Sequence, residues 1–227
     1  MKQRILLLVA AALSICCVTM RAAAEDNQGA EPLVPLTLKL PSPVFAGTPK
    51  SAPPGVRIEP ASAKSPPPLM IPRDANNIAI GAKITSSDKH VTGALLSKLT
   101  DGDKEGEEDS IVQLRKGLQW VQFDLRKPCE VFAIAVWHAH DQAKIFRSVI
   151  VQVADDQDFT ENVRTVFNND TDNTSGLGVG QDRQYFETFR GKVFDANRSR
   201  ARYIRLYSNG STDSVLNEYT EVEIYGR

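Results

Sequence analysis

The sequence predicts an all-β sandwich for the part of the chain that follows residue 76. Short runs rich in Val, Ile, Phe and Tyr are separated there by clusters of Gly, Asn, Asp and Ser, which is typical of strands and turns in such a fold. Apolar and polar residues alternate strictly from Val121 to Leu125, which is the period of a strand with one buried face. No long stretch has the 3.6-residue period of an amphipathic helix.

The chain begins with a predicted secretory signal peptide, residues 1–24. Two basic residues precede an apolar run of about fourteen residues, and three alanines end the segment. The run is shorter than the roughly twenty residues that cross a bilayer, so we expect no transmembrane segment in the mature chain. The prediction is export, to the periplasm or out of the cell. A lipoprotein anchored at Cys16 or Cys17 is the alternative, but Ile15 stands where a small residue is expected.

The mature chain is mildly acidic and has a single cysteine. Cleavage after residue 24 leaves only Cys129, so no intramolecular disulfide can form. The leader holds three of the 27 basic residues and none of the 28 acidic ones, which leaves 24 against 28 and a formal charge of −4. An acidic surface without a basic block argues against nucleic acid and anionic lipid as partners.

Residues 25–73 form a predicted proline-rich extended segment. Twelve of the thirteen prolines lie between Pro32 and Pro72, and Phe45 is the one aromatic residue. Each proline removes a backbone donor and fixes φ, which excludes a core strand or helix. Because apolar residues punctuate the segment, the sequence leaves open whether it is a free linker or an arm docked on the domain.

Residues 74–227 form the predicted β-sandwich domain. The run 131–137 is apolar on both faces, so we expect a central strand covered on both sides. The one helical candidate is 93–99. Trp120 and Trp137 are expected in the core, and Arg205 is expected in a buried ion pair within a strand. The candidate strands are residues 78–85, 120–125, 131–138, 148–154, 164–167, 184–188, 202–207 and 220–225.

Six short runs stand out along this domain. They are NIA at 77–79, LTDGD at 99–103, WVQFDL at 120–125, VIVQVADD at 149–156, ARYIRL at 201–206 and EVEIYG at 221–226. In order and spacing they resemble the discoidin domain, also called the coagulation factor type C domain, of the galactose-binding-like superfamily, and are similar to family 32 carbohydrate-binding modules. The resemblance implies an eight-stranded antiparallel jelly roll without catalytic machinery in its core strands. Many animal members tie their ends with a disulfide, and its absence here points to the bacterial carbohydrate-binding branch.

An acidic loop at residues 101–109 predicts a calcium site. Its carboxylates alternate around a glycine at the sixth position, as in a calcium loop, but Val112 occupies the twelfth position, where an EF-hand has a bidentate Glu. A solvated acidic turn is the alternative. The resemblance implies a structural Ca²⁺ held by an Asp-Gly loop and a C-terminal glutamate. Carried over to this sequence, its ligands are the Lys98 carbonyl, Asp101, Asp103, the Thr220 carbonyl and Glu221.

The run from Trp137 to Asp141 holds two of the three histidines where a buried strand enters a loop. His138 and His140 share one face of a strand, which allows a transition-metal pair completed by His90, or plain hydrogen bonding. Ligand binding is the third interpretation, because the resemblance implies His, Arg, Asn and an aromatic ring on rim loops, and sugars offer hydroxyl pairs and an apolar face. The candidate ligand-binding residues are His138, His140, Arg147, Asn168, Asp170 and Asn209.

The sequence predicts a binding protein rather than an enzyme. It contains no nucleophile elbow, phosphate-binding glycine loop or zinc-protease signature. The clustered Asp155, Asp156 and Asp158 are typical of a solvated turn rather than of an acid and base flanking a substrate. We expect a glycan or cell-surface polysaccharide as the partner, bound weakly by rim loops of a calcium-stabilised jelly roll. Recognition of another protein at the cell surface or in the periplasm is the alternative.

Overall fold

The computed structural model describes residues 31–43, 57–60 and 66–227, and the predicted signal peptide lies outside them. Strands make up most of its regular structure. The elements are β1 (Leu33–Pro35), β2 (Met70–Pro72), β3 (Asn76–Asn77), β4 (Lys83–Ser86), α1 (Gly93–Leu96), η1 (Ser97–Thr100), η2 (Glu108–Ser110), β5 (Val112–Leu114), β6 (Gln119–His138), β7 (Ile150–Ala154), β8 (Arg164–Asn168), β9 (Lys192–Ser208) and β10 (Asn217–Gly226). No helix among the described residues has the length and apolar character needed to cross a bilayer.

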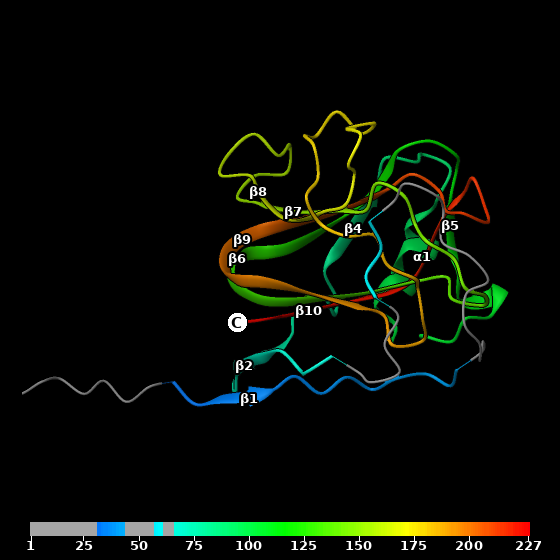
Figure 1. Cartoon of the computed structure of the whole chain (residues 1–227). Coiled ribbons are helices and arrows are strands. Elements are labelled where there is room, and N and C mark those ends of the chain that lie inside the picture. The colour runs from blue at the N-terminus through cyan, green and yellow to red at the C-terminus, as the bar shows by residue number, and fades with distance from the viewer. Residues whose placement is uncertain (1–30, 44–56, 61–65) are drawn as a thin grey trace, which may run out of the picture. The chain divides into compact units, whose positions relative to one another are not determined.

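Eight strands form one antiparallel sheet that folds over on itself. The order is β3-β10-β6-β9-β7-β8, with β4 added at β6 and β5 at β10. The first half of β6 pairs with β4 and its second half pairs with β10, while β9 runs beside β6 along both halves. Figure 1 shows β6 and β9 bending together from one layer to the other. The result is the predicted eight-stranded jelly-roll sandwich, with two layers that share two long strands.

The bends are built by irregular backbone in β6 and β9. Pairing shifts register between Asp124 and Cys129 of β6, and Arg126 there has a φ of 70°. Asn197 and Arg198 of β9 have φ values of 48° and 55° at the second register shift. Pro128 lies in the first bend, where the ladder needs no donor from it. Bulges of this kind increase local bending, so each long strand can serve both layers.

The main core lies between the two layers and comes from alternate strand residues. Val121 and Phe123 of β6 are fully buried, as the alternation predicted, and residues 131–138 are buried throughout. Trp137 is also fully buried, its Nε1–H donating to the Phe189 carbonyl (3.0 Å). Trp120 is only half-buried. Burial of this apolar surface is the main source of stability of the described residues, in which Cys129 is the one cysteine and is unpaired.

The described parts of the proline-rich segment lie against the domain. Strands β1 and β2 pair with each other, and Leu36 and Ile71 pack against Phe132 on β6. Farther along, Ile58 forms a bridge with Gln184. Within the described residues, the segment is therefore a docked arm rather than a free linker.

Several predicted elements have different bounds in the structure. The two predicted strands 120–125 and 131–138 are one continuous strand, β6. Strand β9 begins ten residues before the predicted 202, at Lys192. The predicted strand 184–188 is wrong, because Gln184 makes only an isolated bridge. The predicted helix 93–99 corresponds to α1 followed by η1, and the Thr92 hydroxyl caps α1 by accepting from the Leu95 N–H.

Candidate functional site

The acidic loop and the last strand meet as the calcium prediction requires. The Gly102 N–H donates to Glu221 Oε2 (3.3 Å), which brings the loop after η1 against β10. Pairing of β10 with β6 shifts between Tyr219 and Glu221, so Thr220 is the extra residue of a β-bulge. A bulge leaves its extra residue outside the regular ladder. Glu221 itself is buried, with 1% of its surface exposed.

The electrostatics of Glu221 fit a cation site. Burial, together with the charges of Asp101 and Glu223, raises the pKa of Glu221 to about 8, although the Gly102 N–H opposes the rise. Lys104 lowers that pKa, but its Nζ pairs directly with Glu223 Oε1 (2.6 Å). A hard cation such as Ca²⁺ would stabilise the ionised form of a buried carboxylate that lies beside a second carboxylate.

The remaining predicted calcium ligands differ in whether their oxygens are already engaged within the loop. The Lys98 carbonyl accepts from the Asp101 N–H (3.5 Å) and so lies at the start of the loop. Asp103 accepts from the Glu105 N–H (3.0 Å) and from the Ser110 hydroxyl (2.8 Å), which fixes the shape of the loop itself. In the described part of the chain, no three His, Cys, Asp or Glu side chains are grouped to hold a metal ion. A calcium ion here would therefore draw on backbone carbonyls as well as carboxylates.

His138 and His140 are both interior side chains. His138 has 1% of its surface exposed, contacts Glu187 Oε2 through Nδ1 (3.0 Å) and stacks on the Phe146 ring at 4.3 Å. The Nε2–H of His140 donates to the Lys104 carbonyl (2.8 Å). The two rings are thus held by different neighbours, and neither lies on the surface of the rim.

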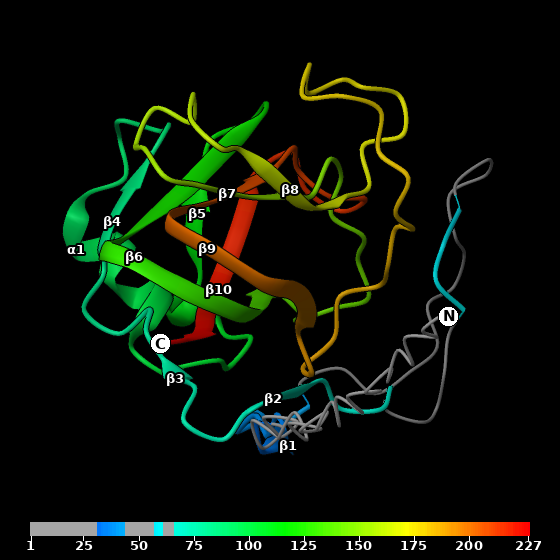
Figure 2. The same ribbon diagram turned by 90° about the vertical axis from the view of Figure 1, so that its left-hand side faces the viewer.

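Asn168 is the last residue of β8, and Asp170 lies in the folded loop between β8 and β9, which Figure 2 shows extending beyond β8. Asp170 accepts from the Thr174 hydroxyl (2.9 Å) and the Ser175 N–H (2.8 Å). Burial opposes its ionisation, but these hydrogen bonds bring the pKa of Asp170 to about 2. Asn168 donates through Nδ2 to the Gly178 carbonyl (3.0 Å). Both side chains are therefore used in shaping this loop.

Arg147 and Asn209 are the predicted ligand-binding residues that the structure brings together near solvent. The Asn209 N–H donates to the Arg147 carbonyl (2.8 Å), and the Arg147 N–H donates to the Gly210 carbonyl (2.9 Å). The Arg147 side chain is exposed and Asn209 is half-buried. These two residues remain candidates for contact with a ligand.

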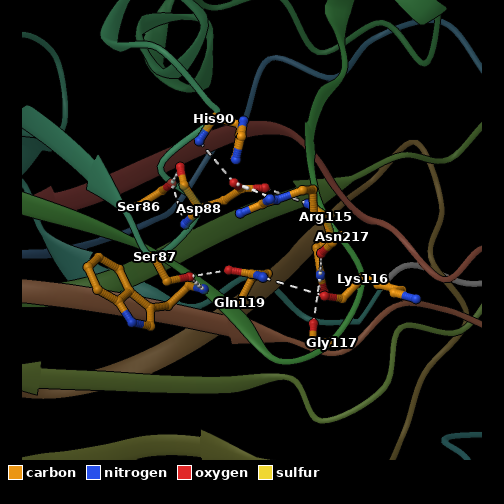
Figure 3. Close-up of polar contacts among 10 residues, drawn as sticks. Ser86, Ser87, Asp88, His90, Arg115, Lys116, Gly117, Gln119 and Asn217 are labelled. Atoms are coloured by element: carbon orange, nitrogen blue, oxygen red, sulfur yellow. Dashed lines mark hydrogen bonds and ion pairs between the residues drawn. The ribbon is translucent and has the colours of Figure 1, made fainter.

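Two buried polar residues that no sequence motif marks, Asn217 and Asp88, hold the rim loops in place (Figure 3). Asn217 donates to the carbonyls of Arg115 (2.8 Å) and Gly117 (2.9 Å) and accepts from the Gly210 N–H (2.9 Å). Asp88 accepts from the backbone N–H (2.7 Å) and Nε–H (3.0 Å) of Arg115. These contacts lower the pKa of Asp88 despite its burial. Both buried side chains thus have their hydrogen-bond partners inside the protein, as buried polar groups need.

A concave polar pocket lies where β6 ends and β10 begins. Its volume is about 270 Å³, and it is hereafter called the rim pocket. No aromatic ring is among its lining residues. They are Gly106, Glu108, Ile111, Gln113, Asp141, Lys144 and Glu218. No sequence pattern predicts this pocket, because its walls come from three separate stretches of the chain, residues 106–113, 141–144 and 218, which share no motif.

Lys144 is the charged centre of the rim pocket. Its ammonium is 2.8 Å from Asp141 Oδ1, 3.3 Å from Glu218 Oε2 and 3.9 Å from Asp213 Oδ2. Burial favours the neutral amine, but the carboxylates of Asp141 and Glu218 outweigh it and raise the pKa of Lys144 above its usual range. The lysine therefore stays charged and holds loop 139–148 against the start of β10.

Comparison with known proteins gives likenesses of fold. No protein-family model matches the chain, and no curated protein sequence matches it. Among solved structures, it is similar to the CBM32 of AlyQ in complex with 4,5-unsaturated mannuronic acid, with 19% identity over 62% of this chain and 92% of that chain and a TM-score of 0.45. A Streptococcus pneumoniae fucose binding module, SpX-3, gives 14% identity over 66% and 97% of the two chains and a TM-score of 0.46.

A third likeness is to a family 89 glycoside hydrolase from Clostridium perfringens in complex with PUGNAc. Identity is 16% over 66% of this chain and the TM-score is 0.48, and the match spans 14% of the hydrolase chain. Likenesses at this level of identity say nothing about which ligand this chain binds. The pairings of its own strands identify the chain as an eight-stranded antiparallel jelly-roll sandwich, the fold that its resemblance to the discoidin domain predicted.

Proposed function

We propose that this chain is an exported, non-catalytic carbohydrate-binding module that takes a glycan in the rim pocket. The observation that carries the proposal is the pocket itself, a hollow in which several polar side chains converge. Carboxylate and amide groups of this kind form hydrogen bonds with the hydroxyl groups of a sugar. Arg147 and Asn209, on the adjoining loops, are close enough to each other to extend the contact. Export follows from the predicted leader, to the periplasm or out of the cell.

A binding role suits the chemistry of the pocket better than an acid–base role does. Asp141 and Glu218 both pair with the Lys144 ammonium. Gln113 also donates to Glu218 Oε1 (3.3 Å). The oxygens of these carboxylates already accept from donors of the protein, and this arrangement suits the binding of a ligand by hydrogen bonds.

Calcium forms the second part of the proposal. Asp101, Glu221 and the carbonyls of Lys98 and Thr220 hold a structural Ca²⁺, with Asp103 shaping the loop beside it. Support comes from the buried Glu221 and its contact with the Gly102 N–H. The same loop continues through Lys104, which contacts His140, to Gly106 and Glu108 in the wall of the rim pocket. A cation at Glu221 would therefore brace one wall of the binding site.

The test is a glycan array probed with the exported full chain in calcium buffer. The proposal expects retention on a defined set of glycans, and loss of that retention in Gln113→Ala and Arg147→Ala variants with unchanged melting temperatures. Arg164→Ala, an exposed arginine on β8, is the matched control and should bind as the unmodified protein does. Absence of retention on every glycan would overturn the proposal.

Protein recognition is the second candidate. Val215, on the rim loop before β10, is 64% exposed, and the pocket lining has no aromatic ring on which a sugar could stack. Crosslinking of the exported protein on intact cells, followed by mass spectrometry, distinguishes the two. Crosslinks from Val215→Cys to one protein, together with an empty array, would favour this candidate.

A further inference from the structure

The rim pocket carries excess negative charge. Glu108, Asp141 and Glu218 supply three carboxylates to its lining, and Lys144 supplies the one ammonium. Asp213 adds a fourth carboxylate 3.9 Å from the same ammonium. One lysine cannot neutralise these groups, so the pocket is electronegative. Field lines concentrate in a concave site with low-dielectric walls, which strengthens the effect on a ligand.

The pocket also offers acceptors but few donors. Lys144 already serves Asp141 and Glu218, and Gln113 Nε2 already donates to Glu218. The carboxylate of Glu108, by contrast, is exposed and makes no hydrogen bond or ion pair with any residue of the described chain. A ligand that brings hydrogen-bond donors therefore finds acceptors in this pocket, whereas a ligand that brings only acceptors finds no free donor among the described lining residues.

A buried nitrogen beside the pocket wall has the same character. His140 has 2% of its surface exposed, and its Nδ1 has no hydrogen-bond partner among the described residues. Since Nε2–H donates to the Lys104 carbonyl, Nδ1 presents a lone pair in the neutral ring. A Cβ added to Gly106 would lie 3.0 Å from this nitrogen, so Nδ1 faces the wall where Gly106 lines the pocket. His140 Nδ1 is therefore an unpaired hydrogen-bond acceptor next to the Gly106 wall, and it adds to the negative character that the carboxylates give the pocket.

We infer that the rim pocket selects a sugar bearing a free ammonium group, that is, an unacetylated hexosamine unit of a polysaccharide. This inference rests on the proposed function and names the class of sugar for the same site. The ammonium is placed between Glu108 and Asp141, where it forms charge-assisted hydrogen bonds. Ring hydroxyls donate to Glu218, and the lone pair of His140 Nδ1 adds to the negative potential behind the Gly106 wall. An acetylated sugar loses the charge, and a uronic acid adds repulsion.

The experiment compares three probes by titration calorimetry on the exported full chain in calcium buffer. They are a β-1,4-glucosamine tetramer, its fully N-acetylated counterpart and a uronic acid tetramer. We expect the glucosamine tetramer to bind best and the uronic acid tetramer worst. Added salt should weaken glucosamine binding selectively, because an exposed ion pair is screened.

Variants of Glu108 test the assignment of the ammonium. Because Glu108 is exposed and unpaired, Glu108→Gln should fold normally and weaken glucosamine binding by about three- to tenfold, the difference between a charge-assisted and a neutral hydrogen bond. Affinity for the acetylated tetramer should change by less than about twofold. Glu108→Lys should weaken glucosamine binding further. Glu161→Gln, an exposed acid on the loop before β8, is the control and should change none of these values.

Two outcomes separate failure of the inference from failure of the proposed function. Equal affinity for the glucosamine and acetylated tetramers, or glucosamine binding that is unchanged in Glu108→Lys, would overturn the inference and leave glycan binding in place. Absence of binding to all three probes and to every glycan on the array would overturn both.

Discussion

Glu221 should make the stability of the calcium-free protein fall as the pH rises. Its carboxyl group has a pKa of about 8 in the folded chain and an ordinary value of 4.5. Between those values the folded state binds more protons than the unfolded state, so each step up in pH favours unfolding. At about 1.4 kcal/mol per pKa unit, the folded state loses roughly 3–4 kcal/mol between pH 5 and pH 8 from this group alone.

The assay is urea denaturation of the full chain with chelator, at pH 5 and pH 8, for the unmodified protein and for Glu221→Gln. The variant cannot ionise at this position, so its free energy of unfolding should fall by roughly 3–4 kcal/mol less over that pH range. Saturating calcium should restore the unmodified protein at pH 8, because binding to the folded state alone stabilises it. The variant should gain much less from calcium.

The matched control is Glu161→Gln, whose side chain is exposed and distant in sequence from the calcium loop. It should follow the unmodified protein at both pH values. If the chelated protein and Glu221→Gln lose stability equally from pH 5 to pH 8, the burial argument for Glu221 is refuted.

Four further predictions concern the loops, the core, the arm and the site. Asp170→Asn should lower the free energy of unfolding by about 2 kcal/mol at pH 7, because the folded-state pKa is depressed to about 2. This difference should vanish as the pH falls through 2, and a difference that persists there in urea denaturation would contradict it. Gly191→Ala should cost about 3 kcal/mol, because its Cβ would lie 2.6 Å from the Trp137 ring at a φ of +65°. Gly176→Ala, with a φ of +73° and no atom within 4 Å, should cost about 1 kcal/mol, and equal melting temperatures for the two variants would refute the packing argument. Leu36→Ala should cost about 2–3 kcal/mol if the arm is part of the fold, and an unchanged denaturation midpoint would show that it is not. Chelation should weaken binding of an array-selected glycan by about tenfold or more in titration calorimetry, since the loop at Glu221 continues into the rim pocket, and unchanged affinity would separate the two sites.

Local sequence patterns were enough to predict the layers of the fold. Alternation over residues 121–125 identified the buried face of β6, and the apolar run 131–137 identified its central half. Both follow from the two-residue period of a strand, which is a property of neighbouring residues. The bends are not local in this sense. Asn197 and Arg198 occupy left-handed backbone conformations in β9, and no pattern of apolar residues marks that position.

The candidate site was less predictable because its partners lie far apart in sequence. His138 was predicted on the rim because histidine is a common ligand-binding residue and stands at a strand end here. In the structure, Glu187 and Phe146 hold it inside the core. Arg205 was expected in an ion pair, yet it donates to Gln122 Oε1 (2.8 Å) and lies 4.4 Å from the Trp120 ring centroid. Such pairings depend on which strands become neighbours, and a single sequence does not encode that adjacency in any short motif.

The rim pocket shows most clearly how residues that lie far apart in sequence form one site. Glu108 lies near the end of the acidic loop, Asp141 follows β6 and Glu218 is the second residue of β10, so each belongs to a different part of the chain. In sequence each has the appearance of an ordinary surface acid. Only the antiparallel pairing of β10 with β5 and β6 brings them to one hollow.

The central claim is that the rim pocket is where a sugar binds, and an amide chemical-shift titration of the isotope-labelled full chain with the glucosamine tetramer tests it directly. We expect the largest shifts at Gly106, Glu108, Gln113 and Asp141, and little change at Asp156 or Thr165, which do not line the pocket. Shifts confined to other surfaces, with these four amides unmoved at saturation, would contradict it.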